Sequence, residues 1–339
     1  MANKYNEIRK KFESLPPDER RDFTAFVKSS SNARSYTINK LVAAKEKDGV
    51  ECPHCGHTRA VKFGIRRGIQ WYRCKNKKCE RTFSGVTNTF LSSTKKDFRV
   101  WKKFFKCMMD GFRIRKTAEI CRISIKTAFV WRHKILDALA KYQETKRLKG
   151  IIETDDTFFP LSYKGGKLPK GRKAHKRGTP APKKGISKEK VCVSCAIDRR
   201  KRIYSKVTAL ACPSARALRK AFDKIFVNKS STVICSDRDK AYASFIAKKG
   251  FNHIQLEDGL AQQGEYHVQN INSYHSGLKR FLRLFNGVST KYLNNYLVWY
   301  NVIEAKQKSR VVLLKLSIKY VSSTRWDNVS DRRAIPILK

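Results

Sequence analysis

The spacing of apolar residues changes near residue 148. From about residue 96 to 147, apolar side chains recur every three to four positions, which predicts amphipathic helices. Beyond 148 they form short runs of strand length. In chain order the second part reads as strands GIIETDDTFF, KVCVSCAIDRR and RIYSKVTAL, helix SARALRKAFDKIF, strand STVICSD, helix KAYASFIAKKG, strand HIQL and long helices from about Asn270. Strands followed by alternating strands and helices predict an α/β fold with a mixed sheet flanked by helices.

The helical part contains the segment RKTAEICRISIKTAFVWRHKIL, which predicts a short helix, a break at residues 122–124 and a second helix capped by Ser124. This pattern is typical of a helix-turn-helix, whose second helix enters the major groove of DNA. A plain helical hairpin fits equally well, because helix pairs are common and the turn lacks glycine. The basic character favours DNA. Ala128, Val130, Trp131 and Ile135 are expected to pack inward, and Lys126, Thr127, Arg132, His133 and Lys134 to reach a groove.

The chain is strongly basic over its whole length. Its 339 residues include 75 Lys and Arg against 28 Asp and Glu, a formal net charge of +47. This excess exceeds what solubility requires and predicts a polyanionic partner, for which nucleic acid is the best candidate. No apolar run approaches the roughly 20 residues of a membrane-spanning helix, and the start MANKYNEIRKKFESL lacks the apolar region of a secretion signal. We therefore expect a cytoplasmic, nucleoid-associated protein without membrane contact.

Four of the ten cysteines form two close pairs, Cys52 with Cys55 and Cys74 with Cys79. Strand-like segments lie between the pairs, and the knuckle CPHCG supplies a tight turn. Four thiolates at this spacing predict a closed, tetrahedral structural zinc site. Four unrelated buried thiols are the alternative, but the surrounding residues are too polar to form a core without a metal. The other six cysteines lie in apolar segments and are expected to fill the core.

Two aspartates end predicted strands. Asp155 lies in the strand GIIETDDTFF, and Asp237 ends the strand STVICSD. Carboxylates at the ends of strands in an open sheet can converge on one point. Oxygen ligands of this kind suit Mg²⁺ or Mn²⁺, which assist reactions at phosphorus. Either aspartate taken alone is more simply a turn former, so the prediction depends on the pair.

A strongly basic loop follows the first of these strands. Residues 162–190 contain eleven Lys or Arg and one acid, with repeated Gly and Pro, and cannot bury their own surface. A loop that only aids solubility is the alternative. Its position after Asp155 instead predicts contacts with DNA. The residues expected to make them are Arg172, Lys173, Lys176 and Arg177.

The sequence resembles the bacterial insertion-sequence transposases of the DDE type, most closely the family numbered fifteen ninety-five. The resemblance covers about residues 40 to 305 and is carried by CPHCG, TDDTFF before GRKAHKRG, SKEKVCVSCAIDR, CSDRDKAY and HVQNINSYHSGLKRF. It implies an RNase H-like fold and metal-dependent DNA cleavage and joining. It also implies that Asp155 and Asp237 are the first two catalytic metal ligands and that Asp156 is acidic but not catalytic.

The same resemblance places Asn272 at the third metal ligand and Lys279 at the lysine seven residues later. Asparagine departs from the three-acid pattern, although relatives with asparagine here are part of the family. An amide oxygen binds Mg²⁺ but adds no charge. Seven residues are two helical turns, which puts both side chains on one face, with His275 as a lesser candidate ligand between them. A solvent-exposed lysine on a basic helix is the alternative for Lys279.

Together these features predict a transposase that binds the inverted-repeat ends of an insertion sequence, cuts DNA with Mg²⁺ or Mn²⁺ and joins the ends to target DNA, as a homodimer or higher oligomer on DNA. An RNase H-like nuclease without joining activity and a non-catalytic DNA-binding regulator are the alternatives. The predicted segments are a helical region at 1–48, a zinc ribbon at 49–92, a helix-turn-helix region at 93–147, an RNase H-like catalytic domain at 148–310 with the basic loop at 162–190, and a tail at 311–339.

Overall fold

The computed structural model describes residues 2–21, 46, 49–66, 69–92, 94, 96, 98–166, 168, 170–171, 185–257 and 262–305. It contains two compact units, Met1–Trp101 and Lys102–Lys339, which are described separately. The predicted tail at 311–339 and most of the basic loop lie outside the described residues. Within the described ranges, none of the helices combines the length and the hydropathy needed to cross a bilayer.

The first unit contains helix α1 (Ala2–Glu13) and a small antiparallel sheet of strands β1 (Ala60–Arg66), β2 (Ile69–Cys74) and β3 (Thr82–Ser84). The apolar core of the sheet is small. Tyr72 and Phe83 stack with ring centroids 5.7 Å apart, and they pack with Cys52 and Cys74. So small a core needs an additional constraint, which a metal ion held by the four cysteines described below would provide.

Helices α3 (Phe98–Met109), α4 (Ile114–Cys121) and α5 (Ile125–Glu144) follow. Arg122 adopts φ 50°, the left-handed conformation that ends α4, where glycine is more common. The Ser124 hydroxyl accepts a hydrogen bond of 3.0 Å from the backbone N–H of Thr127 at the start of α5. The predicted break and the predicted N-cap are therefore confirmed.

Helix α5 is buried along most of its length. Ala128, Trp131 and Ile135 pack inward as predicted. Arg132 is also fully buried: its guanidinium donates to the carbonyl of Phe112 at 2.6 Å and lies 4.7 Å from the ring centroid of Trp299. The structure thus corrects the prediction that Arg132 and its buried neighbour His133 reach a groove. The physical reason is that α5 packs against both α4 and α9, so that two sides of the helix are covered.

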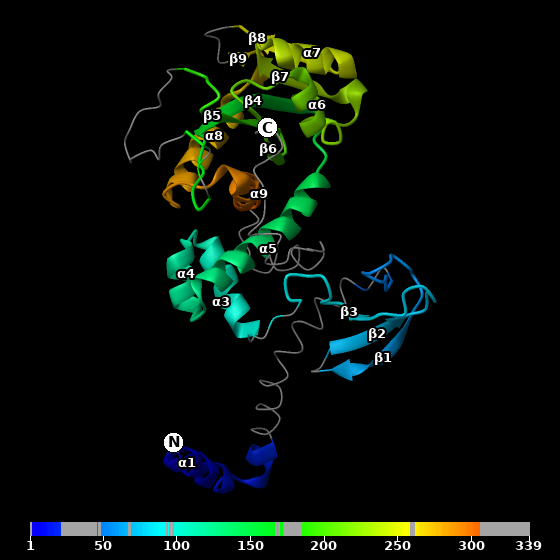
Figure 1. The fold of residues 1–339 in the computed structure, drawn as a ribbon, viewed down its shortest axis with the longest axis vertical. Coiled ribbons are helices and arrows are strands. Elements are labelled where there is room, and N and C mark those ends of the chain that lie inside the picture. Colours follow the sequence, from blue (N-terminus) through cyan, green and yellow to red (C-terminus); the bar gives the residue numbers. More distant parts are fainter. Residues whose placement is uncertain are drawn as a thin grey trace. The chain divides into compact units, whose positions relative to one another are not determined.

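A five-stranded mixed sheet in the order β6-β5-β4-β7-β8 forms the centre of the second unit (Figure 1). β4, β5 and β6 are antiparallel neighbours, whereas β7 is parallel to both β4 and β8. The elements are β4 (Ile151–Pro160), β5 (Lys190–Asp198), β6 (Ile203–Leu210), α6 (Ala215–Phe222), the short 3-10 helix η1 (Lys229–Ser231), β7 (Val233–Asp237), α7 (Lys240–Lys249), β8 (Asn252–Leu256), a hairpin of β9 (Gln262–Gln263) and β10 (Tyr266–His267), α8 (Gln269–Arg283), η2 (Thr290–Tyr292) and α9 (Leu293–Glu304). The predicted mixed α/β sheet is confirmed.

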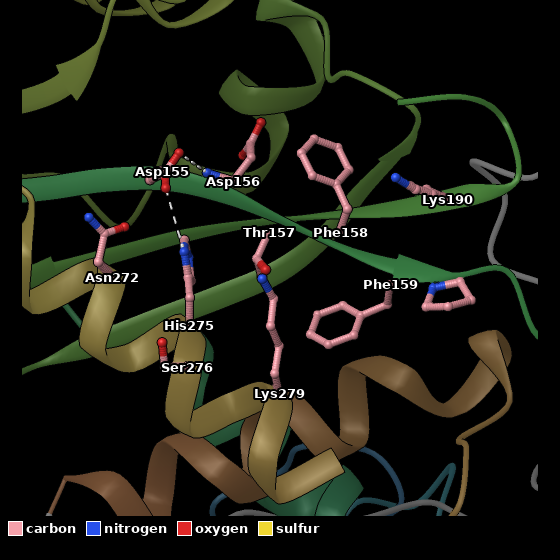
Figure 2. Close-up of a pocket in the computed structure, with 11 residues that line it drawn as sticks. Asp155, Asp156, Thr157, Phe158, Phe159, Lys190, Asn272, His275, Ser276 and Lys279 are labelled. Atoms are coloured by element: carbon pink, nitrogen blue, oxygen red, sulfur yellow. Dashed lines mark hydrogen bonds and ion pairs between the residues drawn. The ribbon is translucent and has the colours of Figure 1, made fainter. Parts of the chain in front are cut away.

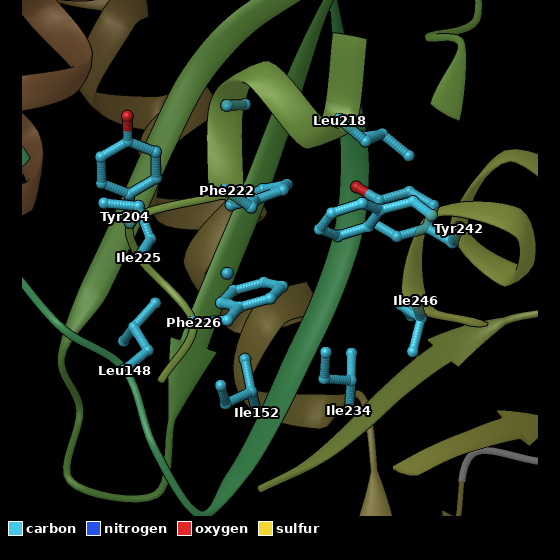
Figure 3. Packing of buried hydrophobic residues seen from close by; sticks show 13 residues of the cluster. Leu148, Ile152, Tyr204, Leu218, Phe222, Ile225, Phe226, Ile234, Tyr242 and Ile246 are labelled. Atoms are coloured by element: carbon cyan, nitrogen blue, oxygen red, sulfur yellow. The ribbon is translucent and has the colours of Figure 1, made fainter. Parts of the chain in front are cut away.

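Helices cover both faces of this sheet. On one face, α6 and α7 enclose an apolar core of β4, β6 and β7 side chains, seen in Figure 3. On the other face, α8 packs on β4 and β5, and α9 packs on β6. The alternation along β6 shows the division: the Tyr204 ring packs on Phe222 of α6, while the Ser205 hydroxyl bonds to Asn301 of α9. The two faces therefore have different chemistry, apolar under α6 and α7 and partly polar under α8 and α9.

Candidate active site

Strand β4 extends beyond its neighbour β7, which leaves part of its edge open. β4 pairs with β5 as far as Pro160, but with β7 only as far as Glu153. No other described strand pairs with β4 on that side. A cavity of about 500 Å³ lies along the open stretch. Its lining, drawn in Figure 2, consists of Asp155, Asp156, Thr157, Phe158, Phe159, Pro160, Lys190, Asn272, His275, Ser276 and Lys279.

Asp155 and Asp237 lie on neighbouring strands. Glu153 of β4 and Cys235 of β7 are the last residues that pair, and each aspartate lies two residues further along its strand. Because side chains alternate with a period of two, each aspartate points to the same face as the last paired residue of its own strand. The negative charge of Asp237 acts on Asp155, although Asp237 does not line the cavity. The structure thus brings together the two aspartates that the sequence singled out.

The ionisation of Asp155 reflects this position. Burial and, secondarily, the negative charge of Asp237 raise the pKa of Asp155 to about 7, against a partly offsetting hydrogen bond from the backbone N–H of Asp156 at 2.7 Å. A partly buried carboxylate beside a like charge is stabilised in its ionised form by a cation. The pair therefore has the electrostatic character of a metal site.

Helix α8 presents Asn272, His275 and Lys279 to the same side (Figure 2). Asn272 and Lys279 are exposed to the cavity, and the charge of Lys279 acts on Asp155. The Nδ1 atom of His275 lies 3.5 Å from Oδ2 of Asp155. The predicted two-turn spacing therefore places an amide oxygen and an ammonium group opposite the strand that carries Asp155.

His275 is buried and uncharged. Burial lowers its pKa to about 4, and the charge of Lys279 acts in the same direction. Its Nε2 atom is buried without a hydrogen-bond partner among the described residues. A neutral imidazole beside Asp155 can hold that carboxylate in place or contact an ion, but it adds no charge of its own.

Asp156 points to the opposite face of β4. Its carboxylate accepts a hydrogen bond of 2.8 Å from the hydroxyl of Tyr242 on α7, and burial raises its pKa. It lines the cavity only because the strand edge is open there. The alternation of β4 thus gives the two adjacent aspartates different surroundings.

Glu153 was not singled out from the sequence, although it fixes the helix that carries Asn272. It is 1% exposed, accepts a 3.0 Å bond from the backbone N–H of Ile271 and a 2.6 Å bond from the Asn270 side chain, and pairs with Arg199. A carboxylate at this end of α8 also complements the helix dipole. The one signal in the sequence was an acid within an otherwise buried strand, two residues before Asp155.

Close packing fixes the far side of α8. A Cβ atom added at Gly277 would lie 2.0 Å from the hydroxyl of Tyr300 on α9. Glycine is therefore required where the two helices meet, and the position of α8 is set from both sides, by Glu153 and by α9.

The donor set fits a hard divalent cation. Asp155 and Asp237 offer carboxylate oxygens, and Asn272 offers an amide oxygen, on two neighbouring strands and a facing helix. Oxygen ligands with room for water and phosphate are what Mg²⁺ and Mn²⁺ prefer. The neutral amide leaves the site with fewer negative charges than three acids would give.

The four cysteines of the first unit form a second, distinct centre. Their sulfur atoms all lie within 4.8 Å of one another, with Cys52 to Cys79 at 3.8 Å and Cys55 to Cys74 at 3.6 Å. Sulfurs bound to one tetrahedral zinc ion at about 2.3 Å are about 3.8 Å apart, so the spacing fits. A backbone hydrogen bond at His57 is the main cause that lowers the pKa of Cys55 to about 7, which favours the thiolate.

The other residues predicted to contact DNA differ in how exposed they are, and some lie outside the described residues. Lys126 is exposed in the first turn of α5, where Thr127 bonds to Ser124. Lys134 is half-buried, and burial lowers its pKa. The loop residues Arg172, Lys173, Lys176 and Arg177 lie outside the described residues. Of the predicted groove residues on α5, Lys126 in the first turn is the one that is exposed.

Comparisons with known proteins find a family match and a relative. Residues 147–299 match the ISXO2-like transposase domain family. An uncharacterized protein in the transposable element ISH50 of Halobacterium salinarum is 25% identical over 263 residues, which covers 76% of this chain and 86% of that protein. This relative is archaeal, so the resemblance is not restricted to bacterial proteins.

Among solved structures, a pre-cleavage Mos1 transpososome matches at 11% identity, 65% of this chain, 79% of that chain and a TM-score of 0.21. A Mos1 transposase paired-end complex with the left transposon end matches at 12% identity, 65% of this chain, 80% of that chain and a TM-score of 0.23.

Proposed function

We propose that the protein is a DNA transposase that binds the inverted-repeat ends of its element and catalyses metal-dependent DNA cleavage and strand transfer. The observation that carries the proposal is that Asp155 and Asn272 line one open cavity, while the charge of Asp237 on the neighbouring strand acts on Asp155. The match of residues 147–299 to a transposase domain family supports it. The net charge of +47 supports a DNA partner.

In this proposal the five-stranded sheet with helices on both faces is an RNase H-like fold. Asp155, Asp237 and Asn272 would hold Mg²⁺ or Mn²⁺. When bound, such ions supply Lewis-acid stabilisation of charge at phosphorus and activate an attacking hydroxyl. Lys279 binds a DNA phosphate beside the metal ligands, and His275 holds the Asp155 carboxylate. No side chain forms a covalent bond to DNA.

The other segments supply recognition. The Cys52–Cys79 cluster would hold structural Zn²⁺ and, with α4 and the first turn of α5 as a helix-turn-helix, contact the element ends. The basic loop, through Arg172, Lys173, Lys176 and Arg177, adds phosphate contacts, which position DNA without reading its sequence. Pairing two ends requires at least a dimer on DNA. We propose the domain boundaries given by the sequence, in an intracellular, nucleoid-associated protein.

A strand-transfer assay tests the proposal. Labelled DNA carrying the inverted repeats that flank the coding region is incubated with the protein, Mg²⁺ and target plasmid. We expect nicked ends and joined products, and we expect Asp155→Ala and Asp237→Ala to retain end binding while cleavage falls by about a hundred- to thousandfold. Cleavage without joining would instead identify a nuclease, and end binding without any metal-dependent cleavage a regulator. Parental activity in either variant would mean that the active site is misassigned.

A further inference from the structure

Two phenylalanines in the candidate active site are not explained by core packing. Phe158 and Phe159 are half-buried at the end of β4 and line the cavity beside Asp155. Neither ring makes a ring–ring contact with another described residue. Other phenylalanines of the same unit do: Phe222, Phe226, Phe245, Phe281 and Phe285 each contact at least one ring. Apolar rings left facing a polar cavity indicate a ligand with an apolar surface.

The order of side chains along one face of β4 indicates what that ligand is. Asp155, Thr157 and Phe159 alternate onto the face that α8 covers, about 7 Å apart from one to the next. Lys279 reaches toward Thr157 from α8, as Figure 2 shows. Lys190 of β5 pairs with Pro160 at the far end. The cavity therefore runs from a metal-binding carboxylate past a cation to an aromatic ring and a second cation.

Thr157 adds an independent observation. It is 2% exposed, lines the cavity, and its hydroxyl has no hydrogen-bond partner among the described residues. A buried hydroxyl without a partner is costly, and an acceptor brought in by a ligand would remove that cost. A phosphate oxygen held by Lys279 is such an acceptor. The strand face thus offers contacts for a sugar–phosphate backbone and, next to them, for a base.

We propose that Phe159 is the stacking platform for one unpaired nucleobase of the DNA strand that is cut. The inference rests on the proposed function for the identity of that strand. Phe159 lies four residues after Asp155, about 13 Å along the strand. This distance corresponds to at most about four nucleotides at the helical rise of one strand. A base inside a duplex cannot expose its face to a side chain, so the nucleotide must leave the stack.

Phe158 provides a matched control. It is adjacent in sequence, half-buried in the same cavity, and projects from the other face of β4, where Asp156 and α7 lie. Replacing either ring by leucine keeps a large apolar side chain but removes the aromatic face. Only the Phe159 substitution removes the proposed platform.

Photocrosslinking tests the site without requiring catalysis. The full-length protein is mixed with single-stranded oligonucleotides containing 5-iodouracil in the presence of Ca²⁺, irradiated, and analysed by peptide mass spectrometry. We expect a crosslink at Phe159 that Phe159→Leu abolishes and Phe158→Leu leaves in place. Crosslinks confined to other residues, or equal yields in the two variants, would overturn the inference. Thermal unfolding shows whether both variants fold.

The rate of DNA cleavage measures how much stacking on Phe159 contributes to the reaction. One abasic nucleotide is moved through four positions on either side of the scissile phosphate. Stacking of one base on an aromatic ring predicts an approximately five- to hundredfold loss of cleavage rate at one position for the parent protein. Phe159→Leu should lose a similar factor on intact DNA and be insensitive to the abasic site. An unchanged profile in this variant would contradict the platform.

The two tests separate this inference from the proposed function. If Phe159 is crosslinked but the protein never cuts DNA, the base-stacking role of Phe159 is supported and the transposase function is refuted. If the protein cuts DNA in a metal-dependent reaction but Phe159 is not crosslinked, the transposase function is supported and the base-stacking role of Phe159 is refuted.

Discussion

Asp155 is the residue whose ionisation decides whether the candidate site can hold metal. Burial and the charge of Asp237 raise its pKa from 3.8 to about 7, so the metal-free carboxyl is largely protonated below that pH. A metal ion competes with this proton. Affinity for Mg²⁺ is therefore expected to fall as the pH drops below about 7. His275 does not contribute to this change, because its pKa of about 4 keeps it neutral throughout that range.

The same pKa predicts a stability change in the metal-free protein. Because the folded pKa lies above the unfolded one, the contribution of Asp155 to stability is fully present below about pH 4 and is lost as the pH rises through about 7. Its magnitude is at most about 4 kcal/mol. Asp155→Asn should avoid this loss, so that its melting temperature in EDTA exceeds that of the parent increasingly from pH 5 to 8. Mg²⁺ should stabilise only the parent.

Asp110→Asn is a suitable control for this measurement, because Asp110 is exposed and lies outside the cavity. Melting temperatures that differ equally from the parent at every pH in both variants would show that Asp155 titrates as an ordinary surface carboxyl.

The sequence predicted that Asp155 and Asp237 each end a strand. Asp237 does end β7, but β4 continues to Pro160, so Asp155 lies within its strand, two residues beyond the point where pairing with β7 stops. Glu153 and Phe159 were not recognised, since their importance depends on what α8 and the shorter β7 do in three dimensions. Arg132 was misplaced because its helix looked basic on one face, while the partners that bury it, Phe112 and Trp299, come from distant segments.

Helix α8 is the element that completes the candidate site, and Glu153 anchors its first turn. Glu153→Gln keeps the size of the side chain but leaves Arg199 without its charged partner. Breaking such a buried pair is expected to destabilise the protein by about 3 kcal/mol. Since α8 carries Asn272, the variant should also bind Mn²⁺ several-fold more weakly, as measured by electron paramagnetic resonance.

Glu144→Gln is the matched control, because Glu144 is exposed at the end of α5. If Glu153→Gln were as stable as this control and bound Mn²⁺ like the parent, the anchoring role of Glu153 would be refuted.

Helix α5 has two roles that can be separated by substitution. Arg132→Ala removes the buried side chain between α4 and α9, with its contacts to Thr117 and Trp299, and leaves a cavity, which is expected to cost about 3 kcal/mol of unfolding free energy. Lys126→Ala, in the exposed first turn, should change stability by less than about 0.5 kcal/mol. It should weaken DNA binding and reduce the slope of log affinity against log salt by about 1.

Urea unfolding and fluorescence anisotropy at several salt concentrations measure both effects. A loss of DNA affinity in folded Arg132→Ala that matches the loss in Lys126→Ala would instead indicate that α5 contacts DNA along its length.

At the element scale the sequence predicted nearly all of the second unit. From residue 151 onward the strands β4 to β8 and the α-helices were visible in the periodicity, because β4 to β7 are buried runs and α6 begins with a side-chain cap at Ser214. The short elements η1, β9, β10 and η2 were not predicted. Strand order and the unequal lengths of β4 and β7 were not predicted. They arise from long-range pairing, to which local patterns contribute little.

Across the whole molecule, two sites have different chemistry. The cysteine cluster lies in a unit whose apolar core is small, which bound zinc would stabilise, and the carboxylate site lies in the other unit. The full-length protein should therefore contain one zinc ion per chain, and Cys55→Ser should release it. Hydrogen exchange in residues 49–92 should then rise, while the β4–β8 sheet keeps its protection.

Cys212→Ser is the control, since Cys212 lies outside the cluster and is exposed, in contrast to the prediction that it fills the core. Zinc content by mass spectrometry that is unaffected by Cys55→Ser would contradict the assignment of the cluster.

The central claim is that Asp155, Asp237 and Asn272 jointly hold divalent cations for chemistry on DNA. Anomalous diffraction from crystals of the full-length protein soaked in Mn²⁺ tests it most directly. The account predicts a manganese peak within about 2.5 Å of oxygen atoms from both aspartates, lost in Asp237→Ala. Fully occupied manganese elsewhere, with no density between Asp155 and Asp237 with or without DNA, would contradict it.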